Sequence, residues 1–367
     1  MSTDPVVINL RPEQFTEAPA VLARAGGLTA STFRYGTGVA ALRIVSEVGR
    51  ITLLPFQGQQ IWDAEFFGRP LAMRSIFDEP IATDDYLSTY GAFLIHCGVA
   101  AMGNPVPTDD HPLHGELPNA RYQEAQLLVG ADADGPYMGM TGCYRHRVAF
   151  RQNYVARPTV WLHARSSRIR AELEVRNLKH LPMDLMYLAH INFRPVDGAR
   201  LVDTVPPGAG HMRVRTALPS LFVPSEDYRR LLAAVVADPS IHRAIEPGRI
   251  IDPELVFALD CLADGAGWAH SMQLHPDGAA DFVSHRPDEL DHGVRWMVRH
   301  GDLDALGLLL PATAEPDGHA AETAKGNVRQ LPPQGAFRCR YEFGALGRED
   351  AERMQRQIDG VLRRSDV

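Results

Sequence analysis

The chain has 367 residues, of which 45% are hydrophobic and 22% charged, and these values are typical of a globular protein with a substantial core. A formal net charge of -8, with no dense Lys/Arg run, argues against nucleic acid or an anionic membrane surface as a partner. No signal-peptide pattern opens the chain and no apolar stretch approaches the roughly 18–20 residues that span a bilayer, so we expect a cytoplasmic protein. The 4 cysteines lack metal-ligand spacing and are expected to be reduced thiols.

Alternation of apolar and polar side chains with period two dominates the sequence and predicts β-strands. The clearest case is residues 168–178, "RIRAELEVRNL", and residues 336–344 repeat the pattern near the end of the chain. Residues 38–55 and 59–73 each predict a hairpin. The chain is therefore expected to be dominated by β-sheet.

Helices are expected at only two places. Residues 225–236 have helical spacing and start with Ser225 as an N-cap, and a second helix is expected within residues 346–367. Because the sequence shows no internal repeat or long polar linker, we expect a single domain over residues 1–367, with residues 1–30 as an N-terminal extension.

Two histidine-containing segments stand out from this background. Residues 186–193, "MYLAHINF", carry apolar side chains at both odd- and even-numbered positions, which indicates a strand covered on both faces. His190 and Asn192 would share one face of that strand, and buried polar groups need polar partners or a polar cavity. Residues 111–116, "HPLHGE", place two histidines and Glu116 close together where proline and glycine argue against a helix.

In order and spacing, several segments resemble the galactose mutarotase-like superfamily, in its aldose 1-epimerase-like branch. They are "LIHCGVAAMGNP…HPLHGELPNARY", "MYLAHINF" and "LLLPATAEPDG…VRQLPPQGAFRCRYEF", and the likeness covers roughly residues 30–345. The resemblance implies a galactose mutarotase-like β-supersandwich, dominated by β-strands, with a few peripheral helices. It also implies that a small-molecule sugar binds in a cleft on a large antiparallel sheet.

The resemblance further implies the site. His114 matches the family histidine that holds a sugar hydroxyl, and His190 matches the one that protonates the ring oxygen. Imidazole suits such proton transfer because its ordinary pKa is near 6.5. The function implied is that of an aldose 1-epimerase, an isomerase that interconverts forms of a free monosaccharide and requires no cofactor.

The sequence departs from the family at the third catalytic position. Relatives in this branch carry a glutamate directly before "PAT", where this chain has Leu310. Glu116 is our candidate replacement, because in an extended segment it would share a face with His114.

Two further interpretations stay open. Imidazole and carboxylate ligands suit Zn²⁺, Mn²⁺ or Fe²⁺, and such a metal would support a sugar isomerase or epimerase. The residues that would hold it are His111, His114, Glu116 and His190. Alternatively, the missing glutamate marks a carbohydrate-binding protein without catalysis.

Five residues are expected to contact the sugar. Trp296 would form an apolar platform, Asn119 and Arg121 would bind hydroxyls or an acidic group, and Asn192 lies on the strand of the second histidine. Gln60 belongs to a glutamine-rich segment where relatives often carry an arginine, which favours a neutral sugar. The sequence also leaves open that the protein forms a homodimer.

Overall fold

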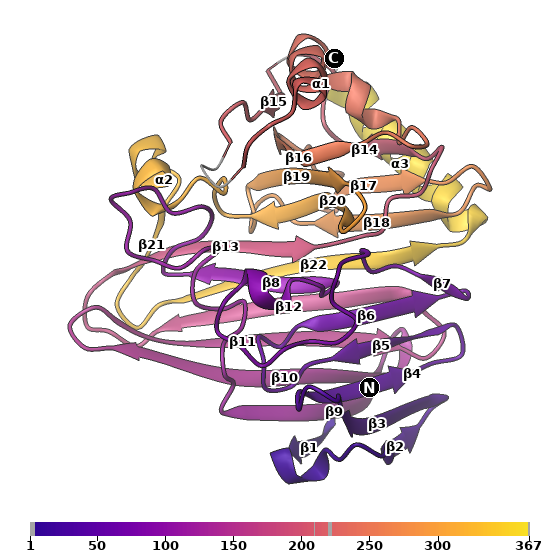
Figure 1. Cartoon of the computed structure of the whole chain (residues 1–367). Helices are drawn as coiled ribbons and strands as arrows, with labels where there is room; N and C mark the ends of the chain where they lie inside the picture. The colour runs from indigo at the N-terminus through magenta and orange to yellow at the C-terminus, as the bar shows by residue number, and fades with distance from the viewer. Residues whose placement is uncertain (1–3, 209, 219–221, 366–367) are drawn as a thin grey trace.

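The computed structural model describes residues 4–208, 210–218 and 222–365. Within these ranges, two large β-sheets form the molecule, and their neighbouring strands pair in antiparallel fashion (Figure 1). The predicted β-dominated architecture with a few helices is confirmed.

The smaller sheet contains the strand predicted at residues 168–178, and the burial of its side chains alternates as expected. Its central strands are long and pair with their sequence neighbours through short turns. In spatial order the strands are β1 (Val6–Leu10), β9 (Glu124–Asp132), β10 (Gly135–Val148), β11 (Gln152–His163), β12 (Arg168–Asn177), β22 (Ala336–Leu346), β18 (Ala280–His285), β17 (Ala269–Leu274) and β14 (Arg200–Asp203).

The larger sheet contains both predicted hairpins, since β4 pairs with β5 and β6 pairs with β7. In spatial order its strands are β15 (Met212–Val214), β16 (Ile251–Leu259), β19 (His292–Arg299), β20 (Asp304–Ala312), β13 (Met183–Ile191), β8 (Leu94–Val99), β6 (Ile61–Phe66), β5 (Gly49–Leu53), β4 (Ala40–Val45), β3 (Leu28–Arg34) and β2 (Ala20–Ala25). Two short strands lie beside this path: β21 (Arg329–Leu331) pairs with β13, and β7 (Arg69–Pro70) pairs with β6.

The two sheets pack face to face around one hydrophobic core. Tyr187 of β13 and Tyr341 of β22 bring their hydroxyl oxygens within 2.9 Å across the interface. Phe93, just before β8, packs against Phe343 of β22 with ring centroids 5.4 Å apart. Because successive side chains of a strand point to opposite faces, the neighbours of Tyr187 at even-numbered positions face away from the smaller sheet.

The helices lie at the periphery, as Figure 1 shows. Ser225 caps α1 by accepting a hydrogen bond from the Tyr228 backbone N–H at 3.1 Å, which confirms the predicted N-cap. The helix α3 packs against one end of the smaller sheet. The α-helices are α1 (Glu226–Ala237), α2 (His319–Lys325) and α3 (Arg348–Ser365), with 3₁₀ turns η1 (Pro12–Gln14), η2 (Leu87–Thr89) and η3 (Pro239–Arg243).

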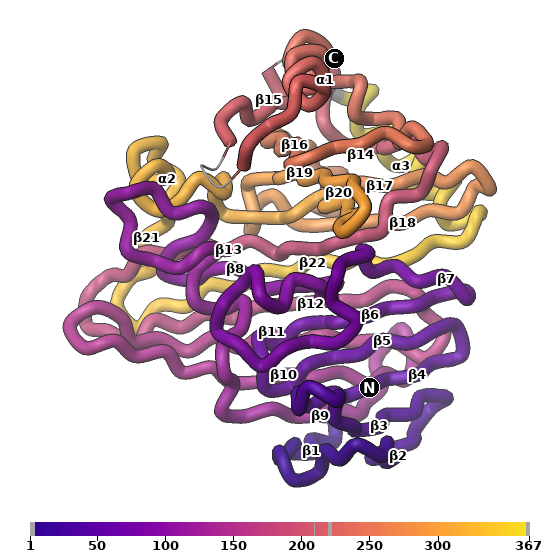
Figure 2. The backbone as a smooth tube through the Cα atoms, in the orientation of Figure 1, coloured from indigo at the N-terminus to yellow at the C-terminus, as the bar shows by residue number. Residues whose placement is uncertain are grey.

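The strand β1 and the helix α3, near the two ends of the described chain, lie at well separated places on the molecule (Figure 2). The segment expected as an N-terminal extension takes part in both sheets: β1 pairs with β9, and β2 pairs with β3. The first three residues of that expected segment, and residues 366–367 of the expected C-terminal helix, lie outside the described residues. In the described ranges, no helix is long and apolar enough to cross a membrane.

Candidate active site

The candidate site is a cavity of about 250 Å³ on the face of the larger sheet that points away from the smaller one. This volume lies just below the roughly 300–1,000 Å³ of pockets for drug-sized ligands, so it suits a small ligand such as a monosaccharide. Four adjacent strands, β16, β19, β20 and β13, supply its floor. Their side chains that line the cavity include Glu254, Val256, Val294, Trp296, Val298, Leu310, Leu188 and His190.

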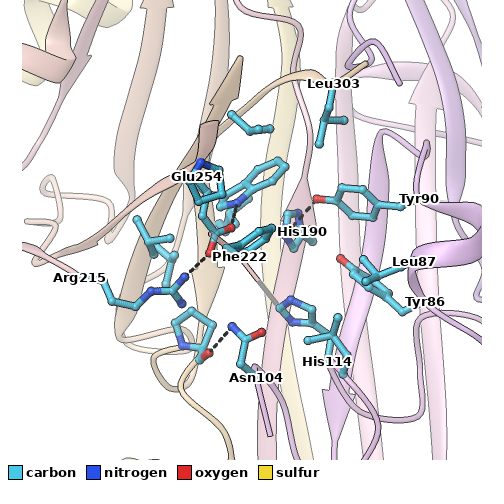
Figure 3. A pocket seen from close by; sticks show the side chains of 18 of the residues that line it. Tyr86, Leu87, Tyr90, Asn104, His114, His190, Arg215, Phe222, Glu254 and Leu303 are labelled. Atoms are coloured by element: carbon cyan, nitrogen blue, oxygen red, sulfur yellow. Dashed lines mark hydrogen bonds and ion pairs between the residues drawn. The ribbon is translucent and has the colours of Figure 1, made fainter. Parts of the chain in front are cut away.

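His190 and Asn192 lie side by side, as the sequence predicted. Asn192 donates from Nδ2 to the Ala92 carbonyl at 3.0 Å, so its Oδ1 faces His190 Nδ1 at 2.7 Å. An amide oxygen only accepts, and His190 Nδ1 therefore carries the proton. The free nitrogen, Nε2, lies 3.5 Å from the Tyr90 hydroxyl (Figure 3). Nε2 is thus the atom that can exchange a proton with a ligand.

Burial sets the charge of this histidine. Loss of solvent lowers the pKa of His190 to about 4, although the hydrogen bond with Asn192 acts in the opposite direction. Burial also raises the pKa of the Tyr90 hydroxyl well above its usual range. At neutral pH the pair is therefore an uncharged imidazole beside an uncharged phenol.

His114 reaches the same cavity from a tight turn. Its backbone has φ 60°, and Gly115 follows with φ 82°, so two consecutive residues are left-handed. A Cβ at position 115 would lie 2.3 Å from the Ala101 carbonyl oxygen and 2.7 Å from the Gly98 carbonyl oxygen, and only glycine fits there. The turn is held against β8 because the Gly98 N–H donates to the His114 carbonyl at 2.9 Å.

The His114 ring completes an aromatic cluster with His190. The two imidazole centroids are 5.5 Å apart in an edge-to-face arrangement, and the Tyr86 ring lies 5.0 Å from His114. The buried Nδ1 of His114 has no hydrogen-bond partner among the described residues. Burial, together with the nearby His190, holds the pKa of His114 well below its usual value. The structure thus brings together the two histidines that the sequence singled out.

Trp296 lies beside these rings. Next to it are two charged residues, Glu254 and Arg215, which the sequence did not reveal as members of the site. The Trp296 centroid is 5.3 Å from that of His190, and its indole N–H donates to Glu254 Oε2 at 2.6 Å. The other carboxylate oxygen, Oε1, forms an ion pair with Arg215. Glu254 lies on a strand whose alternation could have placed it on the cavity face, but Arg215 lies just after a short strand whose register the sequence does not reveal.

Leu310, which the family resemblance matches to the catalytic glutamate, also lines the cavity. It is 1% exposed and lies across from Val294 on the neighbouring strand β19. This part of the cavity wall is therefore apolar.

Glu116 does not line this cavity. Its carboxylate Oε1 accepts hydrogen bonds from the backbone N–H groups of Val99 and Ala100, both at 3.1 Å, and from the Tyr154 hydroxyl. The expectation that Glu116 shares a face with His114 is wrong, because the left-handed turn between them is not extended. Here Glu116 fixes the turn to the end of β8.

His111 also points away from the cavity. Its Nδ1 lies 2.8 Å from the Pro112 carbonyl, and its Nε2 accepts from the His319 backbone N–H at 3.3 Å. The four residues considered for a metal are therefore not gathered into one ligand set. Among the described residues, two other groups bring three ligand atoms within 4.8 Å of one another: Asp132, Asp134 and His163, and Glu315, Asp317 and Glu322.

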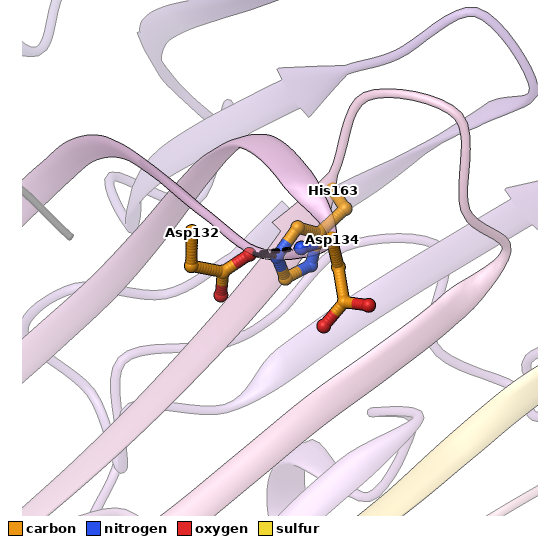
Figure 4. A group of neighbouring side chains, drawn as sticks. All are labelled: Asp132, Asp134 and His163. Carbon is orange, nitrogen blue, oxygen red and sulfur yellow. Dashed lines mark hydrogen bonds and ion pairs between the residues drawn. The ribbon is translucent and has the colours of Figure 1, made fainter. Parts of the chain in front are cut away.

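Both of these groups already hold a cationic side chain. In the first, shown in Figure 4, Arg170 contacts Asp134 at 2.8 Å and Asp132 at 3.8 Å. In the second, Lys325 Nζ lies 2.6–2.7 Å from all three carboxylates. An ammonium group thus occupies the centre of that cluster.

Four of the five expected sugar ligands do not line the cavity. Asn192 is fully buried and its amide is bonded to His190 and to the Ala92 carbonyl. The other three lie elsewhere. Gln60 Nε2 donates to the Pro118 carbonyl at 2.7 Å and to Asn119 Oδ1 at 3.1 Å, so both amides brace a loop. Arg121 is exposed and forms a two-pronged ion pair with Asp84 at 3.0 and 3.1 Å. Neither amide nor Arg121 is part of the cavity lining.

This architecture is similar to that of known proteins. Residues 36–207 match the family model of DUF4432, described as a domain of unknown function. No curated protein matches the sequence. Among solved structures, a provisionally named aldose 1-epimerase from Klebsiella pneumoniae matches with a TM-score of 0.79 and 16% identity, over 98% of this chain and 92% of the other.

A second solved structure, a galactose mutarotase-like protein from Clostridium acetobutylicum, matches with a TM-score of 0.57 and 11% identity. The match covers 93% of this chain and 98% of that protein. Together these similarities confirm the fold that the sequence resemblance implied. The chain has the galactose mutarotase-like fold, and His114 and His190 line one cavity in it.

Proposed function

We propose that this protein is an isomerase of the aldose 1-epimerase type, which interconverts the anomers of a neutral free monosaccharide by acid–base chemistry. The observation that carries the proposal is the convergence of His114 and His190, from a turn and a strand far apart in the chain, on one sugar-sized cavity. Their roles follow from what each ring offers to a ligand.

His190 is the proposed proton donor to the ring oxygen. Because Asn192 holds the proton on Nδ1, exchange with substrate takes place at Nε2. With a pKa of about 4, the imidazolium is a minor but strongly acidic form at neutral pH. A positioned acid or base of this kind typically contributes about 10²–10⁴-fold to rate.

His114 is the proposed hydroxyl ligand. Its ring is neutral, so it offers one donor and one acceptor, the pattern that a sugar hydroxyl matches. The apolar side chains of the cavity and the Trp296 ring suit the C–H faces of the sugar. Because Arg215 and Glu254 pair with each other, the cavity favours an uncharged ligand.

The test is anomer exchange followed by NMR on a panel of neutral aldoses and deoxy sugars, with purified full-length protein. We expect faster exchange for at least one sugar than in buffer alone. If a sugar raises thermal stability without faster exchange, the protein is a carbohydrate-binding protein, because a ligand of the native state stabilises it by mass action. If no sugar of the panel shows faster exchange and none raises thermal stability, the proposal is overturned.

A further inference from the structure

The family's glutamate position is apolar here, but a carboxylate enters the same cavity from another strand. Leu310 lies on β20, and Glu254 lies on β16, with β19 between these two strands in the sheet. Both side chains line the cavity that contains His190. The cavity therefore keeps a carboxylate although residue 310 cannot supply one.

Glu254 is held in place by two donors. The Trp296 indole N–H binds Oε2 at 2.6 Å, and Arg215 pairs with Oε1 (Figure 3). A carboxylate offers about four lone-pair sites, so sites remain for a ligand hydroxyl. The Glu254 side chain is 14% exposed and lines the cavity. Its orientation is thus fixed before a ligand binds.

The position of Glu254 relative to His190 suits a two-sided proton transfer. The Trp296 ring packs edge-to-face against the His190 ring, and the same indole binds the carboxylate through its N–H. Trp296 therefore spaces the carboxylate from the imidazole by about one aromatic ring. Both groups line the same cavity, so one ligand there can reach the carboxylate and the imidazole together.

We propose that Glu254 is the catalytic base, in place of the glutamate that relatives carry at position 310. The inference rests on the proposed function. Glu254 takes the proton of the anomeric hydroxyl, the O1 electron pair forms the carbonyl, and the bond from C1 to the ring oxygen breaks. The electron pair of that bond goes to the ring oxygen, which takes the Nε2 proton of His190 in its imidazolium form and leaves the neutral imidazole. After rotation about C1–C2, closure reverses each transfer, so protons and charge balance.

The main experiment compares Glu254→Gln with wild type on a sugar that wild type exchanges. The amide keeps the size of the side chain but cannot take the proton, so we expect kcat to fall about 10²–10⁴-fold. Sugar-induced thermal stabilisation should persist, and the loss of rate at acid pH that marks a carboxylate base should disappear. Glu226→Gln, on the exposed face of α1 and paired with Arg230, is the matched control and should behave as wild type.

The outcomes separate the two proposals. If wild type exchanges no sugar, the proposed function fails. If wild type exchanges a sugar and folded Glu254→Gln keeps kcat within about threefold, the function stands and Glu254 is not the base.

A second variant covers the case in which Glu254→Gln does not fold. Glu254→Asp keeps the negative charge and the donors Arg215 and Trp296, but its side chain is one methylene shorter, which draws the carboxylate back from the sugar. We expect kcat to fall about tenfold. The loss of rate at acid pH should be retained. Unchanged kcat in folded Glu254→Asp would overturn the assignment.

Discussion

The turn at residues 111–116 has two sides that differ in chemistry. On the inner side, His114 meets His190 in a cavity of about 250 Å³ with mostly apolar walls. On the outer side, His111 and Glu116 line a polar hollow of about 520 Å³. The outer side chains are tied to backbone groups, whereas the buried Nδ1 of His114 has no partner in the described part of the chain.

This difference teaches that neighbours in sequence need not share a site. Two left-handed residues, His114 and Gly115, reverse the chain, and Glu116 therefore points to the opposite side. The inner side chain faces the cavity and is free to bind a ligand, whereas the outer side chains hold the turn in place. Changes on the two sides should therefore affect different properties, activity on the inner side and stability on the outer side.

The largest effect is expected on the inner side. His190→Ala removes the proton donor but replaces a side chain that faces the cavity, so the fold should persist while kcat falls about 10²–10⁴-fold. NMR exchange rates measure the loss, and circular dichroism checks the fold. His180→Ala, at an exposed position, is the control. Full activity in folded His190→Ala would remove this residue from the mechanism.

Acid should destabilise the protein through its buried histidines. Burial lowers the pKa to about 4 for His96 and His190 and to about 3 for His242 and His285. Below the unfolded value of about 6.5, the unfolded chain binds protons that the folded chain refuses, so stability falls as pH drops from about 6.5 towards 4. Urea unfolding at pH 7.5 and 5 should differ by several kcal/mol, because each histidine loses about 1.4 kcal/mol per pH unit below about 6.5. Equal stability at both values would contradict the buried neutral state.

On the outer side, a change should act first on stability. Glu116→Ala leaves the Val99 and Ala100 N–H groups and the Tyr154 hydroxyl without their acceptor, which should cost on the order of 3 kcal/mol. Urea unfolding measures the loss, with Glu226→Ala as the exposed control. Glu116→Gln keeps one acceptor oxygen and should lose less. A loss below about 0.5 kcal/mol would show that the carboxylate does not hold the turn.

The smallest effect is expected at Arg121. Its ion pair with Asp84 is exposed, and such pairs contribute about 0–1 kcal/mol. Arg121→Gln should therefore leave the anomer exchange rate and the Michaelis constant within about twofold of wild type. A tenfold rise of the Michaelis constant would instead place Arg121 among the sugar ligands, as the sequence had led us to expect.

Part of this molecule could be predicted from its sequence. Alternating patterns revealed the strands, and the two-residue spacing of His190 and Asn192 predicted their contact, because β-strand geometry fixes the relation of residues two apart. The convergence of His114 with His190 came from the family resemblance.

The remaining features depend on geometry that sequence patterns do not encode. Glu116 was misplaced because its side of the turn depends on the φ angles of His114 and Gly115. Arg215 and Glu254 were missed because their pairing requires the order of strands in the sheet, which joins β15 to β16 and β16 to β19. The sequence places these segments in order but not side by side.

The most direct test of the central claim is a crystal structure of the His190→Ala variant with a monosaccharide that wild type exchanges. We expect the sugar in the inner cavity, with hydroxyls on His114 and Glu254 and one face on Trp296. A sugar bound instead in the outer hollow beside His111 and Glu116 would contradict it.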